Sequence, residues 1–219
     1  MNTCELILFD LDGVTIDTEP LYARGEIRLF KEYDITIPKE DWKLFRGCTE
    51  ETFYDLSMDR YGITEDRKTF QNKGRAYVRE EFEKNLAFMP GFIALIKRLN
   101  GQYPVGLVTA TPEYMYNWLD ERLDLSGIFK HIVYGGMTKR GKPSPDPYLL
   151  GMKQFNINPK NTMIVEDSVH GIQAGLSANA RVVALTGSVD IEDMPPAHRI
   201  INSLNEIDAN FINSLFKSL

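Results

Sequence analysis

Two aspartates near the start of the chain, Asp10 and Asp12, stand one residue apart directly after the apolar run Leu6–Phe9. A short apolar run followed by a glycine, here Gly13, is typical of a strand buried on both faces of a parallel sheet. Two carboxylates about 4 Å apart repel by roughly 4 kcal/mol at an effective dielectric near 20, and a divalent cation or a shared proton relieves that repulsion. The alternative is a loop with two solvated acids. Their position at the carboxyl end of a buried strand favours a ligand site, where Gly13 allows a ligand to approach the backbone.

Further polar groups follow the later apolar runs of the chain. They are the hydroxyl of Thr109, the N–H of Ala110, the ammonium of Lys142 and the carboxylates of Glu166 and Asp167. Taken singly, a threonine at a strand end usually satisfies its own backbone, and a lysine in a loop is usually solvated. Because the carboxyl ends of parallel strands meet at one edge of a sheet, we expect all of these groups to lie together. A phosphate dianion needs donors and a cation, and Mg²⁺ needs hard oxygen ligands, so the combination indicates a site for both.

The order of apolar runs and amphipathic segments after residue 88 predicts an α/β fold. The expected strands are residues 105–108, 132–134, 162–165 and 182–185, and the expected helices are 91–99, 112–123, 148–155, 168–178 and 206–216. Ser168 is expected to cap its helix, and Asn179 to adopt the left-handed conformation after that helix ends. Strands that alternate with helices imply a doubly wound parallel sheet with right-handed crossovers.

Between the first strand and this alternating region the sequence contains only helix-like segments. Thr18 can cap a helix with Pro20 in its first turn, and residues 50–61 and 65–82 carry apolar side chains at helical spacing. We therefore expect a small all-helical domain at residues 17–85, inserted into an α/β core formed by residues 1–16 and 86–219.

Composition limits the classes of partner and compartment. The chain has 219 residues, 43% of them hydrophobic and 26% charged, with a formal net charge of −6 and no basic stripe, which argues against nucleic acid or an anionic membrane as the partner. Its two cysteines, Cys4 and Cys48, match no metal-binding or redox spacing. No secretory signal and no run of about 20 apolar residues is visible. We expect a cytoplasmic monomer.

Four motifs in order along the chain resemble those of the haloacid dehalogenase-like (HAD) hydrolase superfamily, in its phosphatase and β-phosphoglucomutase-like branch. They are DLDGVTID, the strand end at Thr109, GKPSPDPY around Lys142, and EDSVHGIQAG. The helical insertion resembles the small cap of these enzymes. The resemblance implies that Asp10 is a nucleophile that forms an aspartyl-phosphate and that Asp12 is the general acid and base. It further implies that Mg²⁺ is held by Asp10, the Asp12 carbonyl and Asp167, with Glu166 close by or also ligating.

The same resemblance implies that the loops and the cap contact the substrate. We expect substrate contacts from Gly13, Thr18, Tyr22, Arg46, Glu50 and Ala110. β-Phosphoglucomutases carry a histidine where this chain has Tyr22 and an arginine where it has Glu50. These differences favour simple hydrolysis of a small phosphorylated metabolite, expected to be a sugar phosphate, over the mutase reaction, which stays as the alternative.

A more remote alternative is a non-catalytic switch. Response-regulator receivers also place acids, a threonine and a lysine at the edge of a doubly wound sheet, but their phosphorylated aspartate follows the third strand. Here no aspartate ends the expected strand at residues 132–134. A helical insertion of this size is also foreign to receivers. A phosphate-binding relative without activity is a closer alternative, although no acid of the motifs is missing.

Overall fold

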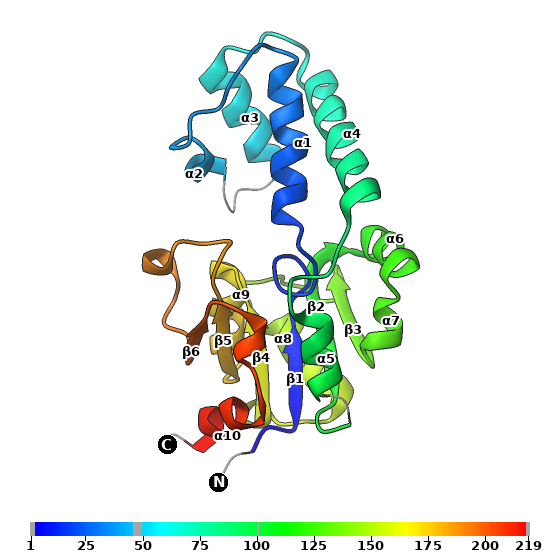
Figure 1. Cartoon of the computed structure of the whole chain (residues 1–219), viewed down its shortest axis with the longest axis vertical. Coiled ribbons are helices and arrows are strands. Elements are labelled where there is room, and N and C mark those ends of the chain that lie inside the picture. Colours follow the sequence, from blue (N-terminus) through cyan, green and yellow to red (C-terminus); the bar gives the residue numbers. More distant parts are fainter. Residues whose placement is uncertain (1–2, 46–49, 100, 218–219) are drawn as a thin grey trace. The chain divides into compact units, whose positions relative to one another are not determined.

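The computed structural model describes residues 3–45, 50–99 and 101–217 and divides into two compact units (Figure 1). The first unit consists of Met1–Ile16 and Phe88–Leu219, and the second is Asp17–Ala87. The connections between them are short. Ile16 pairs with Phe88 as an antiparallel bridge, and the N–H of Asp17 donates to the carbonyl of Ala87 at 3.1 Å. The second unit is therefore an insertion whose two ends meet.

The first unit contains a six-stranded parallel sheet in the order β3-β2-β1-β4-β5-β6. Its strands are β1 (Leu6–Phe9), β2 (Val105–Pro112), β3 (His131–Gly135), β4 (Thr162–Glu166), β5 (Arg181–Leu185) and β6 (Arg199–Ile201). The sheet grows in one direction from β1 to β3 and in the other from β4 to β6. In such sheets ligands bind outside the carboxyl ends of the strands where the order reverses, which here is the boundary between β1 and β4. The predicted doubly wound α/β fold is confirmed.

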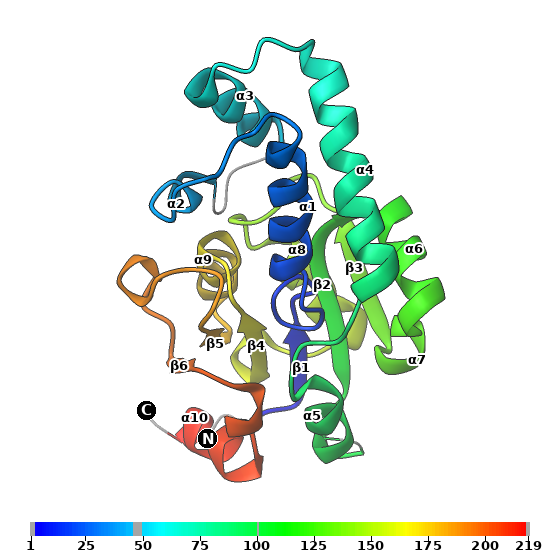
Figure 2. The same cartoon turned by 45° about the horizontal axis from the view of Figure 1, so that its top comes forward.

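Helices cover both faces of this sheet (Figures 1 and 2). They are α5 (Phe92–Leu99), α6 (Glu113–Leu123), α7 (Leu125–Ile128), α8 (Asp146–Phe155), α9 (Val169–Ser177) and α10 (Ala209–Lys217). Side chains alternate along a strand, so Leu6 and Leu8 of β1 join the cluster packed under α8 and α9. Phe9 faces the other way and packs edge-on against Phe92 of α5 at 5.7 Å between ring centroids. This two-sided burial explains the uninterrupted apolar run of β1.

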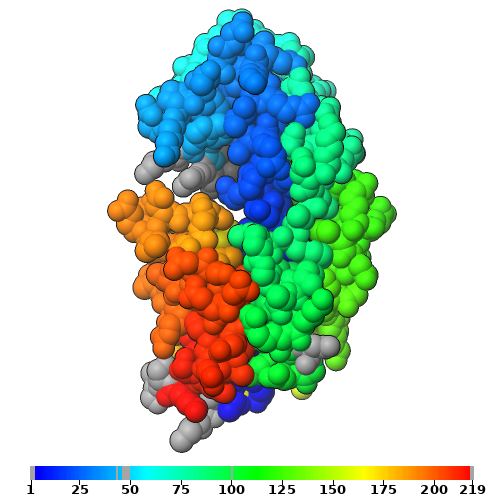
Figure 3. Space-filling view, viewed as in Figure 1, coloured from blue at the N-terminus to red at the C-terminus, as the bar shows by residue number. Residues whose placement is uncertain are grey.

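The C-terminal segment lies beside α5 on the surface of this unit (Figure 3, orange to red beside green). The guanidinium of Arg98 donates to the carbonyls of Leu204 and Ile207 at 3.2 and 2.9 Å. The single-turn helix Leu204–Glu206 occupies the residues where the sequence places the start of the last helix, and α10 begins only at Ala209. The expected start at residue 206 is therefore three residues early, because a separate capped turn precedes the helix.

Several local predictions hold in the first unit, and one strand is missed. The Ser168 hydroxyl accepts a hydrogen bond from the Gly171 N–H at 3.0 Å, and Asn179 has a φ of 60°. The strand β6 has only three residues, two of them exposed, so it carries no apolar pattern to recognise. The strand β2 continues three residues beyond Thr109, with an irregular register between Val108 and Pro112.

The second unit is all-helical and has its own core. Its helices are α1 (Glu19–Lys31), α2 (Trp42–Phe45), α3 (Glu50–Tyr61) and α4 (Arg67–Asn85). The ring of Phe30 lies at the centre of this core, 5.3 Å from Tyr61 and 6.3 Å from Phe70 between centroids. A side chain on Gly25 of α1 would meet the backbone of Val78 of α4 at 2.8 Å, so this glycine allows α1 and α4 to pack closely.

One expectation for this unit is wrong in detail. Thr18 stands at the N-cap of α1, but in the described part of the chain its side chain makes no capping hydrogen bond, because its backbone is helical rather than extended.

Across the residues described, none of the helices is long and apolar enough to cross a membrane.

Candidate active site

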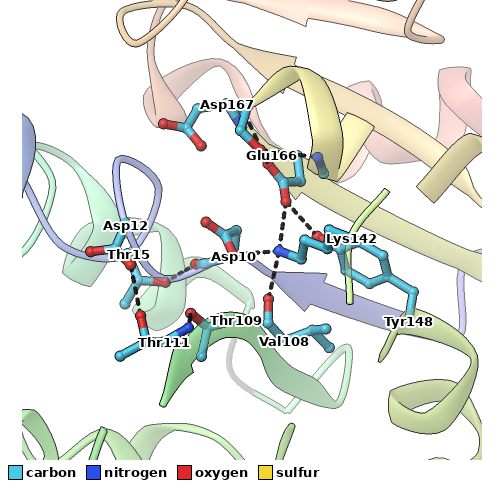
Figure 4. Close-up of polar contacts among 12 residues, drawn as sticks. Asp10, Asp12, Thr15, Val108, Thr109, Thr111, Lys142, Tyr148, Glu166 and Asp167 are labelled. Carbon is cyan, nitrogen blue, oxygen red and sulfur yellow. Dashed lines mark hydrogen bonds and ion pairs between the residues drawn. The ribbon is translucent and has the colours of Figure 1, made fainter. Parts of the chain in front are cut away.

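The ammonium of Lys142 lies at the centre of the polar cluster that follows β1 and β4 (Figure 4). Its nitrogen donates to Asp10 Oδ1 at 2.5 Å, to Glu166 Oε1 at 2.7 Å and to the carbonyl of Val108 at 3.0 Å. These contacts use all three of its protons. The three charged side chains are almost fully buried, with exposed fractions of 7% for Lys142, 10% for Asp10 and 0% for Glu166. The lysine therefore joins the first strand, the second strand and the fourth strand at one point.

The carboxylate of Glu166 is saturated with hydrogen bonds. Its Oε1 accepts from Lys142 and, at 2.9 Å, from the Tyr148 hydroxyl, while its Oε2 accepts from the N–H groups of Asp167 and Ser168 and from the Ser168 hydroxyl. A carboxylate offers about four lone-pair sites, and five donors already point at this one. Burial raises its pKa, but Lys142 and the hydrogen bonds outweigh that effect and leave the pKa lowered. Glu166 therefore anchors Lys142, and a metal would have to compete with these five donors for its oxygens.

Asp10 and Asp167 differ from Glu166 because their pKa values are raised. Carboxylate oxygens of Asp10, Glu166 and Asp167 lie within 4.8 Å of one another. Burial raises the pKa of Asp10 to about 7 against the pull of Lys142, and repulsion from Glu166 and Asp12 adds to the rise. Burial and repulsion from Glu166 and Asp10 likewise raise the pKa of Asp167 well above its ordinary value. The pair thus carries more negative charge than the lysine compensates, and its hard oxygen atoms fit a divalent cation such as Mg²⁺.

Two glycines let the backbone pack directly onto these acids. Gly13 has a φ of +73°, and a Cβ there would overlap Oδ2 of Asp167. A Cβ on Gly171, in the first turn of α9, would overlap Oε1 of Glu166. The hydroxyl of Ser188, in the loop after β5, donates a short hydrogen bond to Asp167 Oδ2. Gly13 is expected from the sequence as a substrate contact in the first motif. Gly171 lies in the fourth motif without an assigned role, and Ser188 lies outside the four motifs.

Three threonines organise the loop that carries Asp12. Thr15 Oγ1 donates to the carbonyl of Asp10 at 2.6 Å, and Thr111 Oγ1 donates to Asp12 Oδ2 at 2.9 Å. The N–H of Thr111 donates to Thr109 Oγ1 at 3.0 Å, so an acceptor site of the Thr109 hydroxyl is already occupied. The predicted residues Asp10, Asp12, Thr109, Lys142, Glu166 and Asp167 are brought together by these contacts and those of Lys142 (Figure 4). Ala110 follows at an exposed position of β2.

Sequence reasoning assigns no role to Thr15, Thr111, Tyr148 or Ser188. Tyr148 closes the GKPSPDPY segment, and its ring lies 4.9 Å from the Lys142 nitrogen, but a tyrosine in the first turn of a helix is ordinarily a core residue. Thr111 stands three residues beyond the end of the expected strand 105–108. The only signal for it in the sequence is a second hydroxyl near Thr109.

The remaining expected contacts belong to the second unit. Thr18 is buried, and Tyr22 is 42% exposed, with its ring edge-on to Phe82 at 5.2 Å between centroids. Glu50 pairs with Arg75 at 2.7 Å, and the hydrogen bond from that guanidinium lowers the pKa of Glu50. The charge of Glu50 is therefore already compensated within its own unit. Arg46 lies outside the described residues.

Gly171→Ala gives a test of the packing around Glu166. Alanine normally stabilises a helix interior by about 1 kcal/mol relative to glycine. Here we expect the reverse, a loss of about 1–3 kcal/mol in the free energy of unfolding, because the added methyl group overlaps the carboxylate that holds Lys142. Thermal unfolding measures the change. Gln173→Ala, at an exposed position of the same helix, is the matched control and should not lower the melting temperature. A Gly171→Ala protein as stable as that control would show that Glu166 can move freely.

Comparison with known proteins agrees with this geometry. Residues 7–185 match the family described as haloacid dehalogenase-like hydrolase, a span that contains all four motifs. A phosphorylated carbohydrates phosphatase of Thermotoga maritima is 29% identical, over 80% of this chain and 81% of its own. The 6-phosphogluconate phosphatase of Escherichia coli is 28% identical, over 83% and 82%. The crystal structure of a candidate beta-phosphoglucomutase from Thermotoga maritima superposes with a TM-score of 0.80 at 26% identity, covering 98% of this chain and all of the other. The resemblance drawn from the motifs is confirmed: the chain belongs to the haloacid dehalogenase-like hydrolase family.

Proposed function

We propose that this protein is a Mg²⁺-dependent phosphatase that hydrolyses a small phosphorylated metabolite through an aspartyl-phosphate on Asp10. Several relatives are named as phosphatases, among them the phosphorylated carbohydrates phosphatase and the 6-phosphogluconate phosphatase. The observation that carries the proposal is the buried arrangement of Asp10 between Lys142 and Asp167, because it unites a carboxylate nucleophile, a fixed cation and a second acid. The family match favours this enzyme over a receiver-like switch.

The proposed reaction has two steps that both pass through Asp10. An oxygen of its carboxylate attacks phosphorus, the bond from phosphorus to the leaving oxygen breaks, and Asp12 gives that oxygen a proton. Asp12 then takes a proton from water as the water oxygen attacks phosphorus. The bond between phosphorus and the Asp10 oxygen breaks, inorganic phosphate leaves, and the Asp10 carboxylate is restored. Charge on the transferring phosphoryl group is stabilised by Lys142 and by the Thr109 hydroxyl, whose proton is not committed within the described residues.

Asp10 and Asp167 are the side chains proposed to hold Mg²⁺, with the backbone carbonyl of Asp12, while Glu166 stays with Lys142. When bound, the ion would neutralise the two acids and draw charge from the phosphoryl oxygens. Ser188 would orient Asp167 through its hydrogen bond to Oδ2. Gly13 would keep the space beside Asp167 open, because any side chain there would fill it.

Removing Mg²⁺ should reveal a dependence of stability on pH. The folded pKa of Asp10, about 7, lies above its ordinary value of 3.8, so the folded state binds more protons and stability falls as pH rises through that window. Mg²⁺ binds the ionised form and should flatten this decline. Urea unfolding at pH 5 and pH 8, with Mg²⁺ and with chelator, measures both slopes. Burial also raises the pKa of Glu26 to about 7. Its effect on stability should be the same with Mg²⁺ and with chelator, so it does not alter the comparison. The same change of stability with pH in Mg²⁺ and in chelator would argue against a metal at Asp10.

The substrate is proposed to be a sugar phosphate, in line with the names of the relatives. Its contacts are proposed to come from Gly13 and Ala110 in the first unit and from Thr18, Tyr22, Arg46 and Glu50 in the second, which we propose acts as the cap. The test is phosphate release from a panel of phosphorylated metabolites with Mg²⁺, with p-nitrophenyl phosphate as a general substrate. No release from any of them would overturn the phosphatase assignment.

The mutase reaction remains the second candidate because of the similarity to the candidate beta-phosphoglucomutase. A mutase must hold its aspartyl-phosphate until a sugar recaptures the phosphoryl group, which requires a group near the cap that exchanges protons close to neutral pH. Tyr22 is poorly suited, since a phenol has an ordinary pKa of about 10 and an imidazole about 6.5. With β-glucose 1-phosphate as substrate, we expect free phosphate and glucose. Formation of glucose 6-phosphate faster than phosphate release would identify the mutase instead.

A further inference from the structure

We propose that Thr111 is a positioning residue that aims the carboxyl group of Asp12 at the leaving oxygen. The inference rests on the proposed function, because it concerns the general acid of that reaction. Its basis is the hydrogen bond of 2.9 Å between Thr111 Oγ1 and Asp12 Oδ2, which joins residues 99 positions apart in the sequence (Figure 4). No motif that we recognised in the sequence includes Thr111.

The end of β2 is built to bring Thr111 to this place. The register between β2 and β3 is regular up to Val108 and shifts before Pro112, so the irregular segment contains Thr111. This segment lies tightly against Gly135 of β3, where any Cβ would overlap the carbonyl of Ala110. The N–H of Thr111 is in turn fixed by Thr109 Oγ1 at 3.0 Å. The backbone from Ala110 to Pro112 is therefore fixed by Thr109 and β3, which places the Thr111 hydroxyl beside Asp12.

A hydroxyl suits this task better than an amide or a cation. It donates to a carboxylate and accepts from a carboxylic acid by rotating one bond, so the contact to Oδ2 can persist when Asp12 gives up its proton and when it takes one from water. A cation would favour only the ionised form. The contact thus restricts the orientation of Asp12 in both steps, and orientation of a reacting group contributes strongly to rate.

The test distinguishes a loss of Asp12 positioning from a nonspecific loss of activity. Thr111→Val keeps the shape and removes the hydroxyl, and Thr111→Ser keeps the hydroxyl. The measurement is kcat/KM, which reports the steps through departure of the leaving group, for a series of aryl phosphates from p-nitrophenyl to unsubstituted phenyl. Poor leaving groups depend most on the acid. We expect Thr111→Val to lower kcat/KM about tenfold or more for phenyl phosphate and less than about threefold for p-nitrophenyl phosphate. Thr111→Ser should remain close to the unmodified protein.

A double variant provides the second arm. If Thr111 acts through Asp12, Thr111→Val should cause no further loss in an Asp12→Asn background, because the group that it aims is gone. Equal losses across the aryl series, or losses that multiply in the double variant, would overturn the inference. Failure of the proposed function is recognised separately, since Asp10→Asn would then retain turnover whatever Thr111 does.

Discussion

Asp10→Asn should lower kcat by several orders of magnitude while the protein stays folded. Asparagine keeps the size of the side chain and an oxygen for the Lys142 ammonium, but it lacks the negative charge that attacks phosphorus. Burial, with repulsion from Glu166 and Asp12, disfavours the ionised carboxylate more than Lys142 favours it, so a neutral amide at this position should not lower the melting temperature. Phosphate release and thermal unfolding measure the two effects.

The matched control for this variant is Asp193→Asn, which makes the same chemical change at an exposed position of the same unit. It should leave both kcat and the melting temperature unchanged. Turnover by Asp10→Asn within tenfold of that control would rule out Asp10 as the nucleophile, whichever substrate is used.

Lys142→Met should abolish activity, and the variant protein should also be less stable. The change leaves Asp10 and Glu166 buried without their cation, and breaking a buried pair in this way costs about 3–5 kcal/mol. Without the lysine, the folded pKa of Asp10, which burial already raises, should rise further, and that of Glu166 should lose the largest cause of its lowering and rise as well. The folded state then binds more protons, so stability increases as pH falls. Urea unfolding should therefore show a larger deficit at pH 8 than at pH 5.

Two further variants make this prediction specific. Lys139→Met removes an exposed cation from the same loop and should change neither stability nor its pH dependence. Glu166→Gln added to Lys142→Met removes one of the two uncompensated charges and should restore part of the lost stability. A deficit of equal size at both pH values would mean that the loss comes from packing rather than from the unpaired acids.

The sequence predicts the parts of this fold that depend on neighbouring residues. The buried run of β1, the Ser168 cap of α9 and the left-handed Asn179 are local features, and each occurs as expected. The helix at residues 50–61 also matches α3 in full. The short edge strand β6 could not be predicted, because a strand of three residues with two exposed side chains buries too little to leave a pattern.

The candidate site can also be predicted only in part from the sequence. Its charged residues are recognisable because acids and a lysine at strand ends are unusual, and the motifs give their order. The sequence does not indicate how the roles of these charged residues differ. Glu166 and Asp167 are adjacent in sequence, yet one carboxylate is saturated by Tyr148, Ser168 and Lys142 while the other faces Asp10 and Ser188. That difference depends on residues distant in the sequence, since Lys142 is 24 positions from Glu166 and Asp10 is 157 positions from Asp167.

The adjoining ends of the insertion have a consequence for how such enzymes diversify. The chain leaves the sheet at Ile16 and returns at Phe88, and these two residues pair directly. A segment inserted at such a point adds no long loop to close, so its length places little entropic burden on the sheet. The helical unit, which has its own aromatic core, can then be exchanged or redesigned as a cassette. Selection could in this way explore new substrates in one region while the strands that carry the proposed catalytic residues stay unchanged.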